Sequence, residues 1–277
     1  MASTKREREL ARLRAQRQAA RRAAAAAERR KRRNAILAGL SALAVAAVIV
    51  VIAITTGGGK DDTLTTGASG TPTSASGACS YSASGTASKQ VTGLPSTDGP
   101  AKKADTKVVL TTNRGEIDLT LHGAKAPCTT NSFTFLAAQK YFDGTSCHRL
   151  TTAGIYVLQC GDPSATGSGG PGYQFADENL NALNTSTCTP EKSATAPCQV
   201  VYPRGTVAMA NAGPGTNGSQ FFLVYKDSPL APNYTPFGTI TKGLDLLDAV
   251  AKGGASSTTG DGKPKLAVTI TTAKVQG

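Results

Sequence analysis

The feature that most constrains the fold is a strand–loop–strand pattern within residues 204–225. Residues 206–210 are apolar and β-branched at their start, and residues 221–225 are apolar and aromatic. Both runs are too short for a helical repeat and are typical of strands. The positions between them, 211–218, consist mostly of Asn, Gly and Pro, which favour turns. The pattern predicts two strands joined by an open loop with little side-chain bulk, against which a peptide strand could lie.

Other short elements surround this pattern. Residues 108–112 and 116–121 alternate apolar and polar side chains on either side of a turn and predict a hairpin. Helical spacing predicts helices over 126–141 and 244–251, and residues 266–275 predict a closing strand. Many short strands with two helices predict an all-β fold, a closed antiparallel barrel whose ends the helices cap.

The positive charge is concentrated at the N-terminus. Residues 1–33 carry 13 Lys and Arg against 3 Asp and Glu, whereas the remaining chain carries 17 against 15. The nearly balanced body argues against a nucleic-acid-binding surface, and no nucleic-acid partner is expected. Residues 1–34 are rich in Ala and Arg and lack a wide apolar stripe, so we predict an exposed helical tail.

An uncharged apolar run follows the tail. Residues 35–54 contain no charged side chain and are long enough to cross a hydrocarbon core as a helix. Lys and Arg fill positions 29–33 immediately before it. The positive-inside rule then predicts a single-pass protein of the cell membrane, with residues 1–34 in the cytoplasm and the remainder outside. The alternative is a cleaved signal peptide, although those have shorter apolar runs.

A stretch rich in Gly, Ser, Thr and Ala separates this run from the folded domain. Residues 55–104 contain too little apolar surface to fold alone and predict a flexible stalk. The folded domain is expected at 105–277. Cys79 is unusual within the stalk: it either attaches the stalk to the domain or is a free thiol.

The chain contains six cysteines and no Cys-x-x-Cys motif. An even number outside the cytoplasm favours disulfides, and the spacing disfavours zinc binding. Cys188 and Cys198 share one polar segment and are predicted to pair. The other four cysteines allow three pairings, which remain open: Cys79, Cys128, Cys147 and Cys160.

The second half of the chain contains three ordered motifs. Residues 209–222 read Met-Ala-Asn-Ala-Gly-Pro-Gly-Thr-Asn-Gly-Ser-Gln-Phe-Phe. Upstream lie His-Arg-Leu at 148–150 and Val-Leu-Gln-Cys-Gly-Asp at 157–162. Downstream lie Phe-Gly-Thr-Ile and Gly-Leu-Asp-Leu-Leu-Asp within 237–248. Together these motifs resemble the cyclophilin family of peptidyl-prolyl isomerases, and residues 209–222 are similar to its central signature. The resemblance covers roughly residues 106–275 and implies a closed eight-stranded antiparallel barrel capped by two helices, with isomerase activity.

The same resemblance assigns roles to individual residues. Arg149 matches the catalytic arginine of the family. Three amide side chains match groups that hold the substrate backbone: Gln159, Asn211 and Gln220. The remaining matches line the proline pocket and the peptide groove: Tyr156, Val157, Ala210, Ala212, Phe222, Leu230 and Tyr234. The reaction needs no nucleophile, metal or cofactor, so none is expected.

These observations together predict a membrane-anchored isomerase. Its expected partners are proline-containing segments of exported proteins, and its folded domain is expected to be monomeric. The alternative is a module that binds and displays such segments at the membrane but isomerises them slowly. Turnover of a proline-containing peptide separates the two hypotheses.

Overall fold

The computed structural model describes residues 78–97, 104–185 and 198–276. The expected basic tail at 1–34, the expected membrane span at 35–54 and Cys188 lie outside these residues. Within the described ranges, no helix combines the length and the apolar character that crossing a membrane requires.

The strands are β1 (Ser82–Ala83), β2 (Thr106–Thr112), β3 (Gly115–Leu121), β4 (Thr145–Ser146), β5 (Arg149–Thr151), β6 (Val157–Cys160), β7 (Tyr173–Gln174), β8 (Val200–Tyr202), β9 (Thr206–Met209), β10 (Phe221–Val224), β11 (Ser228–Leu230), β12 (Pro236–Lys242), β13 (Asp261–Gly262) and β14 (Thr269–Val275). The helices of the described residues are α2 (Pro127–Ala138), α4 (Leu244–Gly253) and the 3₁₀ turn η1 (Leu180–Ala182).

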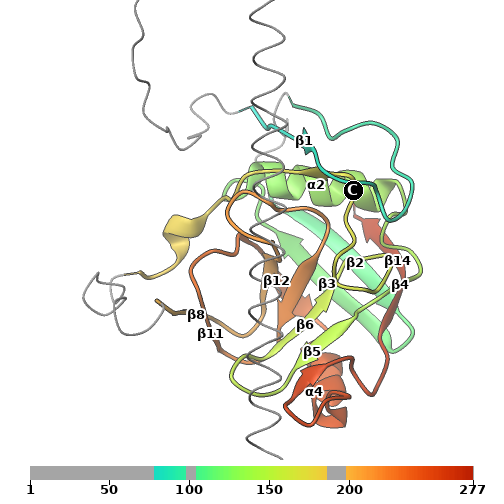
Figure 1. Cartoon of the computed structure of the whole chain (residues 1–277), viewed down its shortest axis with the longest axis vertical. Helices are drawn as coiled ribbons and strands as arrows, with labels where there is room; N and C mark the ends of the chain where they lie inside the picture. The colour runs from blue at the N-terminus through green and yellow to red at the C-terminus, as the bar shows by residue number, and fades with distance from the viewer. Residues whose placement is uncertain (1–77, 98–103, 186–197, 277) are drawn as a thin grey trace, which may run out of the picture. The chain divides into compact units, whose positions relative to one another are not determined.

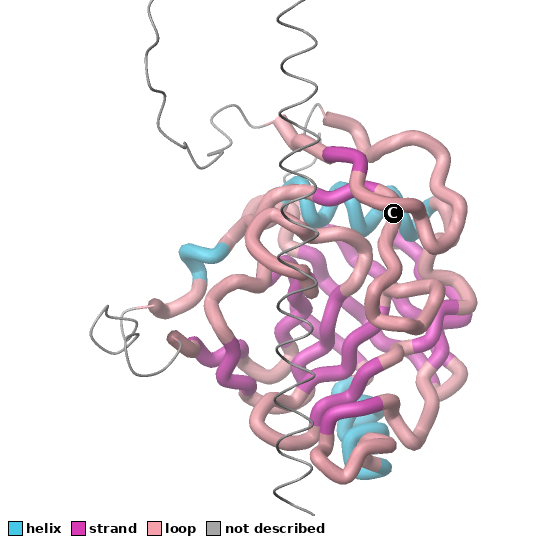
Figure 2. Tube along the Cα trace, viewed as in Figure 1, coloured by secondary structure: helices cyan, strands magenta, loops and turns pink. Residues whose placement is uncertain are grey.

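In the part of the chain that the structure describes, ten strands form one curled antiparallel sheet, in the order β13-β5-β6-β10-β9-β12-β3-β2-β14-β4. Helices α2 and α4 lie at opposite ends of it (Figures 1 and 2). The mainly-β fold with two helices is therefore confirmed. The predicted closed barrel of eight strands is not what the structure shows. The sheet has ten strands, and its order has two ends, β13 and β4. Strands β4 and β5 are separated only by Cys147 and His148 but pair with different neighbours, β14 and β6, so the ladder is interrupted at this point.

Residues of the β2–β3 hairpin and of α2 belong to one hydrophobic core. Val108 and Leu110 of β2 and Leu119 of β3 are almost completely buried, because successive strand residues point to opposite faces of the sheet. Phe133 of α2 packs against the ring of Phe221 at a centroid distance of 5.2 Å. This packing fixes β10, a strand from the central motif, beneath the helix.

Helix α2 begins without a side-chain cap on its own N-cap residue, Ala126. Pro127 opens it, in the position where a missing N–H does no harm. The carboxylate of Glu178 accepts the backbone N–H groups of Cys128 and Thr129, at 3.0 and 2.7 Å. A side chain about fifty residues further along the chain therefore satisfies donors that would otherwise be unpaired.

The segment before the domain is folded onto it, contrary to expectation for part of the stalk. Residues 78–97, which we call the N-terminal strap, pass over α2 in Figure 1. A disulfide joins Cys79 to Cys128, and β1 pairs antiparallel with β7. Tyr81 is 7% exposed, packs edge-on against Tyr173 and donates a hydrogen bond to the carbonyl of Cys128. Of the two alternatives that the sequence left open for Cys79, the structure shows attachment to the domain. The burial of Tyr81 was not predicted, because the segment has little apolar surface.

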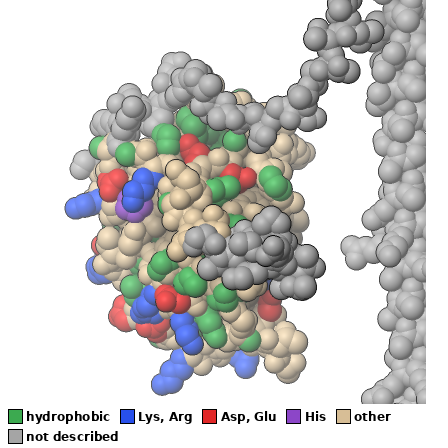
Figure 3. All heavy atoms as spheres, turned by 90° about the vertical axis from the view of Figure 1, so that its left-hand side faces the viewer, with side chains coloured by type: hydrophobic (Ala, Val, Ile, Leu, Met, Phe, Trp, Pro, Cys, Tyr) green, Lys and Arg blue, Asp and Glu red, His purple; other side chains and the backbone are tan. Residues whose placement is uncertain are grey.

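Charges of both signs are interspersed on the face of the domain in Figure 3. This distribution agrees with the near-equal counts of basic and acidic residues after residue 33. Among the described side chains on that face, Lys and Arg do not form an extended basic surface.

Candidate active site

A cavity of about 180 Å³ with both apolar and polar lining lies beside strands β6 and β10. Val157 and Phe222, which line it, are 3% and 4% exposed. The ring of Tyr234 meets that of Phe222 edge-on, with centroids 5.6 Å apart. Leu230 and Ile155 complete the apolar lining. We call this the proline pocket, since its size and lining suit a small apolar ring.

Arg149 brings a positive charge to the proline pocket. It lies on β5 directly opposite Gln159 on β6. Its Nε and Nη2 donate to the two carboxylate oxygens of Asp261, at 2.8 and 2.7 Å. Its Nη1 donates to Oε1 of Gln159 at 3.3 Å. A guanidinium has five N–H donors, so two remain available to a substrate.

The ion pair also fixes the charge states of both groups. Hydrogen bonding to Asp261 raises the pKa of Arg149 above its ordinary value. The same contact with Arg149 lowers the pKa of the Asp261 carboxyl. Near neutral pH, Arg149 is therefore positively charged and Asp261 negatively charged. The carboxylate of Asp261 orients the plane of the guanidinium.

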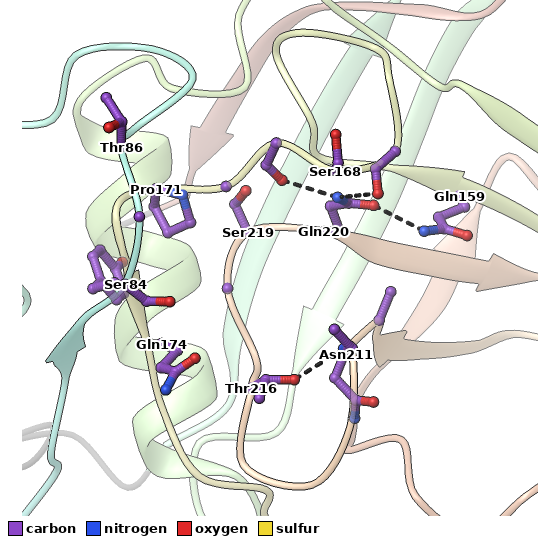
Figure 4. A pocket seen from close by; sticks show the side chains of 18 residues that line it. Ser84, Thr86, Gln159, Ser168, Pro171, Gln174, Asn211, Thr216, Ser219 and Gln220 are labelled. Atoms are coloured by element: carbon purple, nitrogen blue, oxygen red, sulfur yellow. Dashed lines mark hydrogen bonds between the residues drawn. The ribbon is translucent and has the colours of Figure 1, made fainter. Parts of the chain in front are cut away.

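A chain of amide groups continues from the arginine. Nε2 of Gln159 donates to Oε1 of Gln220 at 2.9 Å. Nε2 of Gln220 in turn donates to the carbonyls of Gly167 and Gly169, at 3.0 and 2.9 Å (Figure 4). These hydrogen bonds fix the orientation of both amide groups. Arg149 therefore lies next to polar groups that are held in place.

Asp162 holds the glycine-rich loop that supplies these carbonyls. Its buried carboxylate accepts backbone N–H groups from Ser164, Gly167 and Gly169, among others. Burial alone would raise the pKa of this carboxyl, but the hydrogen bonds from Ser164, Gly169 and Gly167 outweigh it and lower the pKa to about 2. The loop is thus fixed by an ionised group at any pH near neutrality.

Asn211 lines the proline pocket. Its side-chain Nδ2 donates to the carbonyl of Asn233 at 2.7 Å, and its Oδ1 accepts from the N–H of Gly213. Within the described part of the chain, its own backbone N–H and C=O have no hydrogen-bond partner. The side chain therefore shapes the loop, and the main chain is left to pair with an extended peptide.

A disulfide lies behind the two strands that carry Arg149 and Gln159. Cys147, two residues before Arg149, is bonded to Cys160, which follows Gln159. Both cysteines are at most 5% exposed. With Cys79–Cys128, this bond settles the pairing that the sequence left open. Cys198 is also disulfide-bonded, and its expected partner Cys188 lies outside the described residues.

The structure gathers most of the expected site residues around one cavity. Eight of them line the proline pocket: Arg149, Val157, Gln159, Ala210, Asn211, Phe222, Leu230 and Tyr234. Ala212 and Gln220 instead line a second cavity next to it, which also includes Gln159, Ala210 and Asn211. Tyr156 lines neither cavity: its ring contacts Tyr225 and the ammonium of Lys226. Its neighbour Val157 faces the proline pocket, and adjacent residues on a strand point in opposite directions.

Comparison with known proteins agrees with this geometry. Residues 107–275 match the family described as cyclophilin type peptidyl-prolyl cis-trans isomerase/CLD. This match covers more than half of the sequence, and the chain belongs to the cyclophilin family.

Individual relatives are similar over the same part of the chain. A probable peptidyl-prolyl cis-trans isomerase B of Mycobacterium tuberculosis (strain ATCC 25618 / H37Rv) is 53% identical over 177 residues, covering 62% of this chain and 55% of the relative. The protein of the same description from Mycobacterium leprae is 51% identical over 173 residues, covering 62% and 57%. The chain thus spans little more than half the length of these relatives. A crystal structure of a cyclophilin type peptidyl-prolyl cis-trans isomerase from Cryptosporidium parvum matches with a TM-score of 0.50 and 28% identity, covering 63% of this chain and 99% of that one.

Proposed function

We propose that this chain catalyses cis–trans isomerisation of X–Pro peptide bonds in polypeptides. The observation that carries the proposal is the placement of Arg149 beside an apolar pocket made by Phe222, Val157 and Leu230. Amide resonance sets a barrier of about 18–20 kcal/mol to this rotation. The uncatalysed step takes tens to hundreds of seconds, so a catalyst has a large effect on folding.

The chemistry needs only positioning and one donor. The proline ring occupies the pocket, and the backbone of Asn211 pairs with the flanking peptide. As the amide twists, the prolyl nitrogen loses resonance and becomes a better hydrogen-bond acceptor. A free N–H of Arg149 directed at that nitrogen stabilises the twisted state more than the planar one, which is the condition for catalysis.

A substitution of Arg149 tests the proposal. Losing one preorganised donor costs about 10²–10³ in rate. In a protease-coupled assay of the purified full-length chain, Arg149→Ala should lower kcat/KM by at least about 10² and change peptide affinity only modestly. Arg149→Lys should restore only part of the rate, because a point charge on a flexible stem does not reproduce a planar fork. Binding without turnover in the wild type would instead favour the slow peptide-binding module.

We further propose that the domain acts outside the cytoplasm, on exported proteins, from a single membrane span at 35–54. The uncharged run and the cluster of Lys and Arg before it support this topology. So do the two disulfides Cys79–Cys128 and Cys147–Cys160, since such bonds persist in oxidising compartments.

Topology is tested by reporter fusions. Reporters joined after residue 60 should be active only outside the cytoplasm, and the mature protein should keep its original N-terminus. A mature N-terminus beyond residue 54 would mean a cleaved signal peptide and a secreted enzyme.

A further inference from the structure

The N-terminal strap is hydrogen-bonded to the glycine-rich loop that joins β6 to β7. The backbone N–H of Ser84 donates to the carbonyl of Gly172 at 2.9 Å. Ser88 binds Gly170 in both directions. Its N–H donates to the carbonyl of Gly170 at 2.9 Å, and its Oγ accepts the N–H of Gly170 at 3.0 Å. The side chain of Ser88 thus holds a backbone group of the loop as well as its own main chain.

The strap and the loop are in close contact at these positions. A Cβ on Gly169 would overlap both the carboxylate of Asp162 and the Oγ of Ser88. A Cβ on Gly172 would approach the backbone nitrogen of Ala87 to 3.2 Å. Only glycine allows the loop to lie this close to both groups. The strap is therefore one of the surfaces that fix the course of the loop.

The same part of the loop leads to Arg149. The carbonyl of Gly169 accepts a hydrogen bond from Nε2 of Gln220 at 2.9 Å (Figure 4). Oε1 of Gln220 accepts from Gln159, and Oε1 of Gln159 accepts from Arg149. The carbonyl of Gly169 and the N–H of the following residue belong to one peptide group, which is planar. Fixing that N–H therefore also fixes the direction of the carbonyl that binds Gln220.

The hydrogen bond from Gly170 to Ser88 is at the surface. Ser88 is exposed, so water can replace its hydroxyl as the acceptor, and the bond contributes little to stability. A water molecule would not hold the peptide group in one orientation. Ser88 also lies outside residues 107–275, the part of the chain that matches the family. The family match therefore does not contain this contact.

We propose that Ser88 is a positioning residue for the isomerisation, and that it acts through Gln220 on Gln159 and Arg149. The proposal rests on the isomerase function proposed above. A donor stabilises the twisted amide best when it is oriented before the reaction begins. The hydroxyl of Ser88 orients the peptide group between Gly169 and Gly170, and the amide chain transmits this orientation to the guanidinium. The N-terminal strap therefore contributes to the rate of the reaction.

Removal of the hydroxyl tests this role. Ser88→Ala leaves the backbone of the strap able to bind Gly170 and removes only the acceptor Oγ. In the purified full-length chain, kcat should fall about 2- to 5-fold with KM nearly unchanged, within the range for one net hydrogen bond. The matched control is Ser80→Ala, the same change at an exposed strap position that makes none of the hydrogen bonds to the loop. It should keep both wild-type constants.

A double variant tests the route through Gln220. Gln220→Leu keeps a similar volume but breaks the chain between Gly169 and Gln159, so it should lower kcat by itself. If Ser88 acts through this amide, adding Ser88→Ala to Gln220→Leu should cause no further loss of kcat. Denaturant unfolding of the single and double variants shows whether each is folded under the assay conditions.

The outcomes separate this proposal from the isomerase function. If the wild type turns over no proline-containing peptide, the isomerase function fails and the role of Ser88 with it. If the wild type is active but Ser88→Ala keeps its kcat, or loses no more than Ser80→Ala, only the positioning role is overturned. A loss that appears in KM instead of kcat overturns it too, as does a loss that persists in full in the Gln220→Leu background.

Discussion

Arg149 and Asp261 form a two-pronged ion pair although 112 residues separate them in the chain. Strand β13, which carries Asp261, pairs with β5, which carries Arg149. Both side chains are partly exposed, with 41% and 49% of their surfaces accessible. A pair this accessible contributes little to stability. The role of the ion pair is to orient the guanidinium of Arg149.

The first prediction concerns this positioning role. Asp261→Asn keeps the shape of the side chain but removes its charge and one acceptor oxygen, so the guanidinium is held less firmly. We expect kcat to fall about 3- to 10-fold with KM nearly unchanged, as for loss of a net hydrogen bond. The protease-coupled assay separates the two constants.

A second ion pair supplies the control for Asp261→Asn. Asp248 binds both terminal nitrogens of Arg204 on another part of the surface, and neither residue lines the proline pocket. Asp248→Asn should leave kcat unchanged. Equal losses from the two substitutions would mean that Asp261 acts on general stability and not on the arginine.

The motif-bearing part of the site could be predicted from the sequence, and Asp261 could not. Arg149, Gln159 and Phe222 fall within short contiguous patterns that specify their strands. Asp261 lies in a Gly-Asp-Gly turn, and nothing local links this turn to β5. Its role follows from long-range strand pairing, which side-chain periodicity does not encode.

The same distinction explains the N-terminal strap. Its composition predicts a flexible stalk, because few side chains are apolar. Cys79 and Tyr81 nevertheless anchor it, by a disulfide and by burial against Tyr173. Two residues outweighed the composition of the segment. The strap residues that line the second cavity, Ser84, Gly85 and Thr86, were therefore not predicted.

The second prediction separates binding from chemistry. Phe222 lines the pocket that holds the proline ring, so Phe222→Ala opens this pocket in both the planar and the twisted state. We expect KM to rise together with any loss of kcat, unlike Arg149→Ala. Peptide titration and the coupled assay measure the two effects. Circular dichroism should accompany them, because a buried Phe→Ala change also costs about 3–5 kcal/mol of stability. An unchanged KM in a folded variant would show that Phe222 does not bind the proline ring.

The third prediction concerns the bond between Cys79 and Cys128, whose positions are 49 residues apart. By the loop-closure estimate, a crosslink of this span stabilises the fold by about 4 kcal/mol. The double change to Ala should lower the free energy of unfolding in denaturant by up to that amount. Comparing the wild type with the double variant in reductant is the control for the loss of the side chains, because all disulfides are then open in both proteins. A free energy that does not change would mean that the strap is not constrained by this bond.

The fourth prediction completes the cysteine pairing. Cys188 and Cys198 should be bonded to each other in the oxidised protein, with little effect on isomerisation, because Cys198 does not line either cavity. Mass mapping of peptides from the non-reduced protein checks the bond. Recovery of Cys188 as a free thiol contradicts it.

The last prediction concerns pH. His148, directly before Arg149, is 9% exposed, and burial lowers its pKa below the ordinary value of about 6.5. Below that value the unfolded chain binds a proton that the folded chain resists, so the free energy of unfolding should decrease as the pH falls from about 7 toward 5. His148→Gln removes this titrating ring. The free energy of unfolding should then depend less on pH over that range, whatever the substitution does to stability at pH 7. His122→Gln is the control, since that ring lies at the surface beside Asp105. Denaturant unfolding of the three proteins at several pH values measures the slopes, and an equally steep decrease in His148→Gln would show that other groups cause the loss.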